Sequence, residues 1–265
     1  MATCEPPSRL PFTCAQEQSD MLTVNASLRG PSQLLVALAS HSRHADFDLP
    51  QDFTLPYMVY LQSTRKPCVG SLIHPEWVLT AAHCPPPDKI RLGVYQPSSP
   101  TRKEQRRDPL FTVPHPEFHA HTMSHDLMLI KLSKAANINR HVGTIAIALE
   151  PLTFNESCFI PTWTWNDYKN FTDPDLLAWI YQHSLPFSEC QEMLLKRSYG
   201  NIMCVGRPLK VSSKVKEVSA APAICTGRLH GILSWAKGSI TLGSEGFFTE
   251  VHPYARWIMK IINTH

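Results

Sequence analysis

The stretch Trp77-Val78-Leu79-Thr80-Ala81-Ala82-His83-Cys84 joins a short β-prone run to a histidine and a cysteine. Two later segments carry matching chemistry: Asp126 stands before the apolar run 127–132, and Ser219 lies within the segment 215–225. A hydroxyl is a weak nucleophile at neutral pH unless a neighbouring imidazole takes its proton. A carboxylate can hold that imidazole in the productive tautomer. A site that combined Ser219, His83 and Asp126 would have this chemistry, although a lone His or Ser means little in a chain with 13 histidines.

Short β-prone segments separated by Pro, Asn and Ser begin near residue 55, a rhythm typical of barrels or sandwiches. The expected strands of a first sheet system are 57–61, 68–73, 77–80, 89–92 and 127–132. Those of a second are 144–149, 158–160, 223–225, 229–235 and 246–251. Apolar residues at 254, 257, 258, 261 and 262 follow a helical period and predict a closing amphipathic helix over 253–263.

The composition indicates an extracellular β-rich protein, because the chain has 8 cysteines, 23 prolines and 11 glycines in 265 residues. The sequons at Asn25, Asn155 and Asn170 are candidate glycosylation sites in a secreted chain. The formal net charge of +3 does not suggest a nucleic-acid or membrane-surface partner. The charged run 102–107 is interpreted as a solvated loop because it lacks stacking aromatic residues.

The first 54 residues are expected to form a poorly ordered leader or extension. Their best apolar run, 34–39, is short and follows Arg29, Gly30 and Pro31, which makes it an imperfect signal segment. No apolar stretch approaches the roughly twenty residues needed to cross a bilayer. We therefore expect a secreted monomer whose globular domain spans 55–265, with a first barrel over about 55–150 and a second over about 151–252.

From about residue 55 onward the chain resembles the chymotrypsin-like serine proteases, and within them the inactive serine protease 58 type. The resemblance is carried in family order by the segments around His83, Asp126 and Ser219, by Ser234-Trp235 and by the carboxy-terminal helix. It implies an all-β fold of two packed six-stranded antiparallel barrels with a C-terminal helix. The site would lie in the cleft between the barrels, with Ser219 as nucleophile, His83 as base and Asp126 as the residue that orients the base.

Three of the family's cysteine pairs can be matched position by position. The resemblance implies the pairs Cys68 with Cys84, Cys158 with Cys225, and Cys190 with Cys204. A fourth family pair is replaced at both ends, by Val215 and Ser239, so no stranded thiol results. Cys4 and Cys14 lie outside the matched region, and their pairing stays open.

The departures from the family cluster around Ser219. Glu217 takes the place of an oxyanion-hole glycine; its N-H and that of Ser219 are the candidate donors, and its side chain restricts the backbone. Val218 replaces the aspartate that pairs with the amino terminus released by activation, and no Ile-Val-Gly-Gly-like motif follows Arg43. We expect either other packing around Val218 or a zymogen-like loop. Ala220 and Ala221 replace two further glycines.

The same resemblance assigns a substrate pocket. Ser213, followed by Lys214, stands at the pocket floor where trypsin has an aspartate, so cleavage after Arg or Lys is not predicted. Ser234, Trp235 and Ala236 match the substrate-binding edge strand, and Gly246 matches a glycine of the opposite wall. Lys214 and Lys237 either favour an acidic or polar substrate side chain or are simply solvated.

No metal or cofactor is expected. The group His115, His119 and His121 lacks a cysteine or carboxylate set with closed-site spacing. The segment Val94-Tyr95-Gln96-Pro97 lacks the acidic ligands of the family's calcium loop. His125, the residue before Asp126, is expected to point away from it along a strand and to serve surface or packing roles.

Two functions remain open at this point. The first is a secreted serine endopeptidase, slow or narrow in specificity because of its altered oxyanion loop, acting on a peptide or protein substrate. The second is an inactive homologue that uses its cleft to bind a partner protein. The retained residues His83, Asp126 and Ser219 favour the first, whereas Glu217, Val218 and the missing activation motif favour the second.

Overall fold

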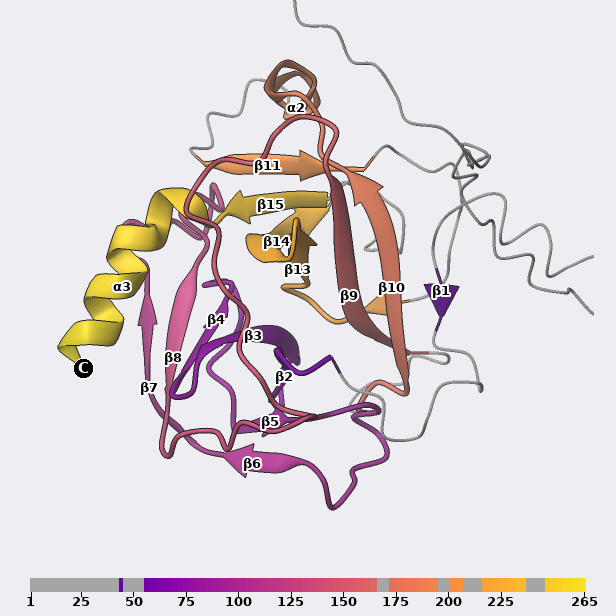
Figure 1. The fold of residues 1–265 in the computed structure, drawn as a ribbon, viewed down its shortest axis with the longest axis vertical. Helices are drawn as coiled ribbons and strands as arrows, with labels where there is room; N and C mark the ends of the chain where they lie inside the picture. Colours follow the sequence, from indigo (N-terminus) through magenta and orange to yellow (C-terminus); the bar gives the residue numbers. More distant parts are fainter. Residues whose placement is uncertain (1–42, 45–54, 166–171, 195–200, 207–215, 237–245) are drawn as a thin grey trace, which may run out of the picture.

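The structure is a computed structural model that describes residues 43–44, 55–165, 172–194, 201–206, 216–236 and 246–265 (Figure 1). The expected extension 1–54 lies outside these residues apart from β1, Arg43–His44. The predictions for Asn25, Asn170, Ser213, Lys214 and Lys237 also lie outside them.

The first sheet is a closed antiparallel barrel. Its strands follow the order β6-β5-β2-β3-β4-β8-β7. They are β2 Met58–Gln62, β3 Cys68–His74, β4 Trp77–Thr80, β5 Lys89–Leu92, β6 Gln105–Arg107, β7 Pro109–Pro114 and β8 Met128–Leu132. The two end strands, β6 and β7, are separated in the chain only by Asp108, so they act as one bent strand that closes the ring into six.

The second sheet closes in the same way. Its main path is β1-β10-β9-β13-β14-β15-β11, and β12 pairs with β9. The strands are β9 Ser157–Trp165, β10 Leu176–His183, β11 Ile202–Val205, β12 Lys216–Glu217, β13 Pro222–Cys225, β14 Arg228–Ala236 and β15 Gly246–Glu250. An antiparallel bridge between Ser184 and Val205 joins the ends of β10 and β11. Six strands therefore form the ring, and β1 and β12 are short additions to it.

The prediction of two packed six-stranded barrels is thus confirmed, and two local predictions are wrong. Residues 144–149 form no strand, because two of their N-H groups bond to different barrels: Ile145 donates to the Leu72 oxygen and Ala148 to the Leu229 oxygen. The run 102–107 is not simply a solvated loop, because 105–107 form β6 and the Arg107 guanidinium donates to the oxygens of Lys134 and Ala135.

A shared apolar core holds the barrels together. Met58, Tyr60, Val69 and Val94 of the first barrel pack against Trp163, Trp165, Leu177 and Val218 of the second. The rings of Tyr60 and Trp163 meet edge to face at 5.5 Å, and the Trp163 indole donates to the Tyr95 carbonyl oxygen at 3.0 Å. The relative position of the barrels is therefore fixed by buried side chains that both barrels contribute.

The helices are few in the described part of the chain. A short helix α2, Phe187–Met193, precedes β11, and a 3-10 turn at His252–Tyr254 leads into α3, Ala255–Thr264. Helix α3 confirms the predicted closing helix and lies beside β7 and β8 of the first barrel (Figure 1). Ile258 is buried in the apolar cluster that contains the first-barrel core, and Trp257 packs on His115, the residue after β7. None of the described helices is long and apolar enough to span a membrane.

Candidate active site

His83 sits on the turn that follows β4, a strand buried along its whole length. The Cys84 N-H closes this turn onto the Ala81 oxygen at 3.2 Å, and a disulfide ties Cys84 to Cys68 at the start of β3. The Thr80 hydroxyl donates to the Val69 oxygen at 2.8 Å. Backbone and covalent bonds therefore both fix the position from which the imidazole projects.

Asp126 is fully buried just ahead of β8 and is surrounded by donors. Its Oδ1 accepts the backbone N-H of His83 at 2.8 Å, and its Oδ2 lies 2.7 Å from His83 Nδ1. The Ser234 hydroxyl also donates to Oδ2, at 2.5 Å. An ionised carboxylate can only accept hydrogen bonds, so this arrangement places the imidazole proton on Nδ1 and leaves a lone pair on Nε2.

Ser219 lies between β12 and β13, with its Oγ 2.7 Å from His83 Nε2. Its carbonyl oxygen accepts the Val69 N-H at 2.8 Å, and its backbone bridges to Cys68. The segment carrying Ser219 is thus attached to the same strand, β3, that anchors the His83 turn. Hydroxyl, imidazole and carboxylate form one chain of short contacts, an arrangement in which the hydroxyl proton can pass to Nε2.

The oxyanion loop follows the register of β12 on β9. Lys216 pairs with Trp165 and Glu217 with Thr164, and the Val218 N-H donates to the Trp163 oxygen at 2.8 Å. Hydrogen-bonded and non-hydrogen-bonded pairs alternate in an antiparallel ladder, so Glu217 and Thr164 form a non-hydrogen-bonded pair. The N-H of Glu217 therefore points away from β9.

The Glu217 side chain is buried and only 7% exposed. Its Oε1 has no hydrogen-bond partner among the residues that the structure describes, and the same holds for Oγ1 of Thr164, its cross-strand neighbour. Burial without a compensating partner disfavours the charged form and raises the pKa of the Glu217 carboxyl from 4.5 to about 7. An ionisable group with a pKa near neutrality therefore lies two residues before the candidate nucleophile in the chain.

Val218 and Ala220 shape the rest of the loop. Val218 is completely buried in the core between the barrels, and its oxygen accepts the Thr162 hydroxyl at 2.9 Å. The apolar slot considered from the sequence is therefore where this side chain packs. Ala220, which is also fully buried, has a φ of 65° in the left-handed region that glycine adopts more readily. The loop keeps a glycine-like backbone there at the cost of strain.

The structure describes some of the residues predicted to form the substrate pocket and not others. Ser234 is buried and bonds to Asp126, a contact that sequence reasoning missed. Trp235 and Ala236 lie on β14 opposite Phe247 and Gly246 of β15. A Cβ added to Gly246 would lie 2.4 Å from the Phe248 ring, so the backbone needs glycine at this position. Ser213 and Lys214 lie outside the described residues.

All three disulfides that the resemblance implies are present. Cys68 is joined to Cys84, Cys158 of β9 to Cys225 of the neighbouring strand β13, and Cys190 of α2 to Cys204 of β11. Cys225 ends β13, which begins three residues after Ser219, so the second disulfide holds the far end of the strand that leaves the candidate site.

The expectation for His125 is wrong in its reasoning. His125 is not a strand residue, because β8 begins at Met128 and His125 has a left-handed φ of 54°. Its ring stacks on His115 with centroids 5.1 Å apart, and its Nδ1 lies 2.9 Å from the Tyr254 hydroxyl. The residue before Asp126 is therefore fixed by aromatic packing. The only hint of this packing in the sequence is the period of apolar and aromatic residues that begins at Tyr254 and predicts the closing helix.

Two groups among the described residues bring potential metal ligands within 4.8 Å of one another. The first consists of Cys68, His83 and Cys84, whose two sulfurs are already joined to each other. The second consists of His115, Glu117 and His125, in which His115 Nδ1 accepts the Glu117 N-H and His125 Nδ1 bonds to Tyr254. Neither is the group His115, His119 and His121 considered from the sequence; His119 Nδ1 bonds locally to Thr122.

Comparison with known proteins agrees with this geometry. The family model described as Trypsin matches residues 48–258. Serine protease 58 of Homo sapiens is 35% identical over 237 residues, covering 88% of this chain and 95% of the relative. Probable inactive serine protease 58 of Bos taurus is 34% identical, covering 83% and 93%, and Trypsin I-P1 of Gallus gallus is 33% identical, covering 79% and 85%. The chain belongs to the trypsin family of serine proteases.

Proposed function

We propose that the protein is a serine endopeptidase in which Ser219, His83 and Asp126 act together on a peptide bond. The observation that carries this proposal is the pair of 2.7 Å contacts from His83, through Nδ1 to Asp126 and through Nε2 to Ser219. As Ser219 Oγ attacks a carbonyl carbon, its proton passes to Nε2 and the buried carboxylate stabilises the imidazolium. The same proton then passes to the leaving amine as the C–N bond breaks, which leaves the acyl group bonded to Ser219 Oγ as an ester. Water hydrolyses this ester, with His83 taking its proton and returning it to Ser219.

The developing oxyanion would be met by the N-H groups of Glu217 and Ser219. The N-H of Glu217 points away from β9 and so is not used by that ladder. At neutral pH, however, part of the Glu217 population carries a negative charge on the same residue that supplies one of these donors, because its pKa is about 7. Loss of one oxyanion donor costs about 100- to 1000-fold in rate, and a repelling carboxylate acts in the same direction. We therefore propose a slow enzyme.

The test is hydrolysis of a fluorogenic peptide library by the purified, disulfide-bonded protein and by its Ser219→Ala variant. We expect slow cleavage of a subset of peptides by the wild type and none by the variant. Absence of cleavage by the wild type, or equal cleavage by both proteins, contradicts the proposal.

A second candidate is a protein-binding module on the same scaffold. The features that favour it are the buried carboxyl of Glu217, whose Oε1 has no hydrogen-bond partner among the described residues, and the presence of Val218 where the family has an aspartate. In that case the cleft binds a partner protein without cleaving it. Retention of partner binding by the Ser219→Ala and His83→Ala variants, together with no hydrolysis by the wild type, is the result that this candidate predicts.

We propose that the protein is secreted and glycosylated. Three disulfides in one domain are typical of oxidising compartments. Asn155 is exposed in the turn before β9 and has a left-handed φ of 65°, so its side-chain amide is accessible. We expect glycosidase treatment to increase the mobility of the protein from culture medium, and Asn155→Gln to remove one step of that shift. Exclusive recovery from the cytosol in reduced form contradicts secretion.

A further inference from the structure

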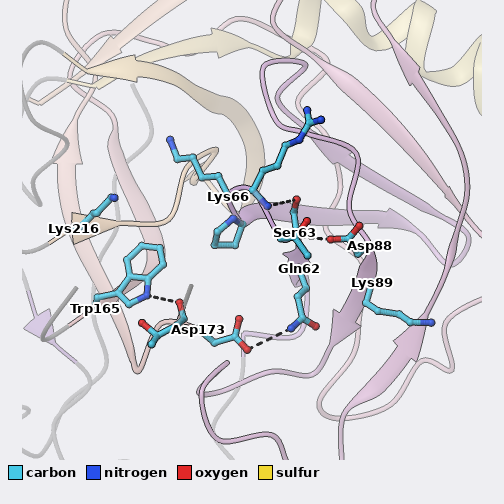
Figure 2. Close-up of a pocket in the computed structure, with 12 residues that line it drawn as sticks. Gln62, Ser63, Lys66, Asp88, Lys89, Trp165, Asp173 and Lys216 are labelled. Carbon is cyan, nitrogen blue, oxygen red and sulfur yellow. Dashed lines mark hydrogen bonds between the residues drawn. The ribbon is translucent and has the colours of Figure 1, made fainter. Parts of the chain in front are cut away.

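A groove lies between the two barrels and has a cavity volume of about 670 Å³ (Figure 2). The first barrel contributes residues 62–67 and 88–89, and the second contributes Trp165, Thr172, Asp173 and Lys216. This volume falls within the range of ligand sites in proteins, about 300–1,000 Å³. Because both barrels line the groove, its shape depends on the same packing that assembles the candidate active site.

The groove is continuous in the chain with the segments that hold Ser219. Pro67 of the groove precedes Cys68, whose backbone bridges to Ser219. Lys216 stands three residues before Ser219, which limits their Cα separation to about 11 Å. A peptide of a few residues whose bond faces Ser219 can therefore reach into the groove.

Positive charge dominates the lining. Four basic side chains, Arg65, Lys66, Lys89 and Lys216, accompany two carboxylates, Asp88 and Asp173. Asp173 already receives the Tyr60 hydroxyl at 2.8 Å and lies 3.6 Å from an Arg91 nitrogen.

The second carboxylate is also engaged, since Asp88 Oδ2 accepts the Thr64 N-H at 2.7 Å. The local fold therefore uses both acidic groups. Lys89 in turn pairs with Asp108, which lies outside the lining, so Arg65, Lys66 and Lys216 carry the excess of positive charge in the groove.

One cation is held over an aromatic ring. Lys216 Nζ lies 6.0 Å from the centroid of the Trp165 ring, and the Trp165 indole is fixed by donating to the Thr172 oxygen at 2.9 Å. Figure 2 shows Lys66 and Lys216 extending from opposite barrels on the same side of the groove. A cation on each wall and an indole in one of them form a surface suited to carboxylate side chains of an extended chain.

We propose that this groove binds an acidic segment of polypeptide adjacent to the bond presented to Ser219, which makes acidic peptides the preferred substrate class. The cleavage part of this inference rests on the proposed endopeptidase function; the binding part does not. Lys66 and Lys216 contact the carboxylates of the segment, and the Trp165 ring packs against its aliphatic portions. The groove thus determines specificity at positions that the primary pocket does not contact.

The experiment measures binding by fluorescence anisotropy with the Ser219→Ala protein, so that cleavage cannot interfere. The probes are a fluorescein-labelled peptide ending in four glutamates and its counterpart ending in four glutamines. We expect the glutamate peptide to bind at least about fivefold more tightly, with a preference that declines as salt rises, because exposed ion pairs are screened. The double variant Lys66→Glu with Lys216→Glu removes the preference, whereas Lys260→Glu on the outer face of α3 preserves it.

Equal affinities for the two peptides, absence of saturable binding by either, or a preference unchanged in the double variant would each overturn the proposal. Circular dichroism of each variant verifies that a lost preference is not lost folding. Hydrolysis by wild-type protein is scored separately with the same peptides unlabelled. A preference for the acidic peptide in binding, without hydrolysis, supports the proposed groove site and counts against the endopeptidase function. Hydrolysis without a preference for the acidic peptide supports the endopeptidase function and counts against the groove site.

Discussion

Glu217 is the residue on which the chemistry of the candidate site depends most. Its carboxyl is buried, its Oε1 is unpartnered among the described residues, and its pKa is about 7. The unfolded chain releases this proton near pH 4.5, whereas the folded chain keeps it until about pH 7. Below pH 4.5 both states are protonated; between the two values the folded state binds more protons, so its stability falls as pH rises.

This linkage predicts the behaviour of Glu217→Gln. Between pH 5 and pH 8 the wild-type free energy of unfolding falls by about 2.5 kcal/mol more than that of the variant, because glutamine cannot ionise. Urea unfolding of both proteins at the two pH values measures the difference. Parallel pH dependence in the two proteins would mean that the carboxylate ionises in contact with water.

Glu217→Gly is expected to speed the reaction of Ser219. Glycine removes both the carboxyl from the residue that supplies a candidate oxyanion donor and the restriction that a side chain places on the loop backbone. We expect the second-order rate of labelling by a fluorophosphonate to rise at least about tenfold at pH 8. A rate that is unchanged or lower would show that the side chain of Glu217 does not limit the site, and Glu192→Gly on the exposed face of α2 serves as the matched control.

The sequence contained much of this site but not all of it. The segments around His83, Asp126 and Ser219 are recognisable because each carries its reactive residue inside its own local pattern. The bond from Ser234 to Asp126 joins residues 108 positions apart, and nothing local to either residue specifies it. The prediction for His125 is wrong because it applies strand alternation to a residue that lies three positions before β8 begins. The left-handed φ of His125 accompanies its packing with His115 and Tyr254.

The loop 93–104 is held against β5 by one buried cation, Arg91. Arg91 on β5 donates from Nε and Nη2 to the two carboxylate oxygens of Glu104, each at 3.0 Å, and from Nη1 to the Pro97 oxygen at 3.0 Å. Both side chains are almost fully buried, at 3% and 1% exposed. A planar guanidinium satisfies three acceptors of the loop at once, which a lysine cannot do.

Glu104→Gln should therefore destabilise the protein strongly. Removing the charge of one partner of a buried ion pair costs about 3–5 kcal/mol, and here the other carboxylate near Arg91, that of Asp173, lies farther away at 3.6 Å and is partly exposed. The exposed pair of Lys89 and Asp108 provides the control, because Asp108→Asn should change stability by less than about 1 kcal/mol. Chemical denaturation followed by tryptophan fluorescence compares them; equal effects would show that burial of the first pair is not decisive.

Secondary structure was predicted best where a strand is buried on both faces. The segments 77–80 and 127–132 are apolar runs, and the structure has β4 and β8 there. Strand β7 was not predicted because its residues do not alternate regularly between buried and exposed and because it contains Pro109 and Pro114. Residues 144–149 were predicted as a strand because they alternate, but two of their N-H groups bond to different barrels. Their hydrogen-bond partners follow from tertiary contacts, which local propensity does not specify.

At the scale of the whole molecule, function depends on two barrels held in one position. His83 and Asp126 belong to the first barrel and Ser219 to the second, and the core containing Tyr60, Trp163 and Val218 lies between them. Because hydrogen bonding is lost beyond about 3.5 Å, a small displacement of one barrel separates the imidazole from the hydroxyl. The stability of this core and the reactivity of Ser219 are therefore coupled.

Trp163→Ala tests the coupling. Truncating this fully buried ring should cost about 3–5 kcal/mol and lower the rate of Ser219 labelling even under conditions where the variant is folded. Phe187→Ala, which truncates a side chain that is 70% exposed, should leave both properties nearly unchanged. Loss of stability with full retention of the labelling rate would show that the site does not depend on the core between the barrels.

The most direct test of the account is covalent labelling of the purified wild-type protein by a fluorophosphonate, read by intact mass and peptide mapping. We predict one adduct per chain, located on Ser219, formed far more slowly in His83→Ala and absent in Ser219→Ala. Labelling requires an activated hydroxyl but no knowledge of the natural substrate. A folded wild-type protein that acquires no adduct, or acquires it at the same rate without His83, would contradict the claim that these side chains form a working nucleophile.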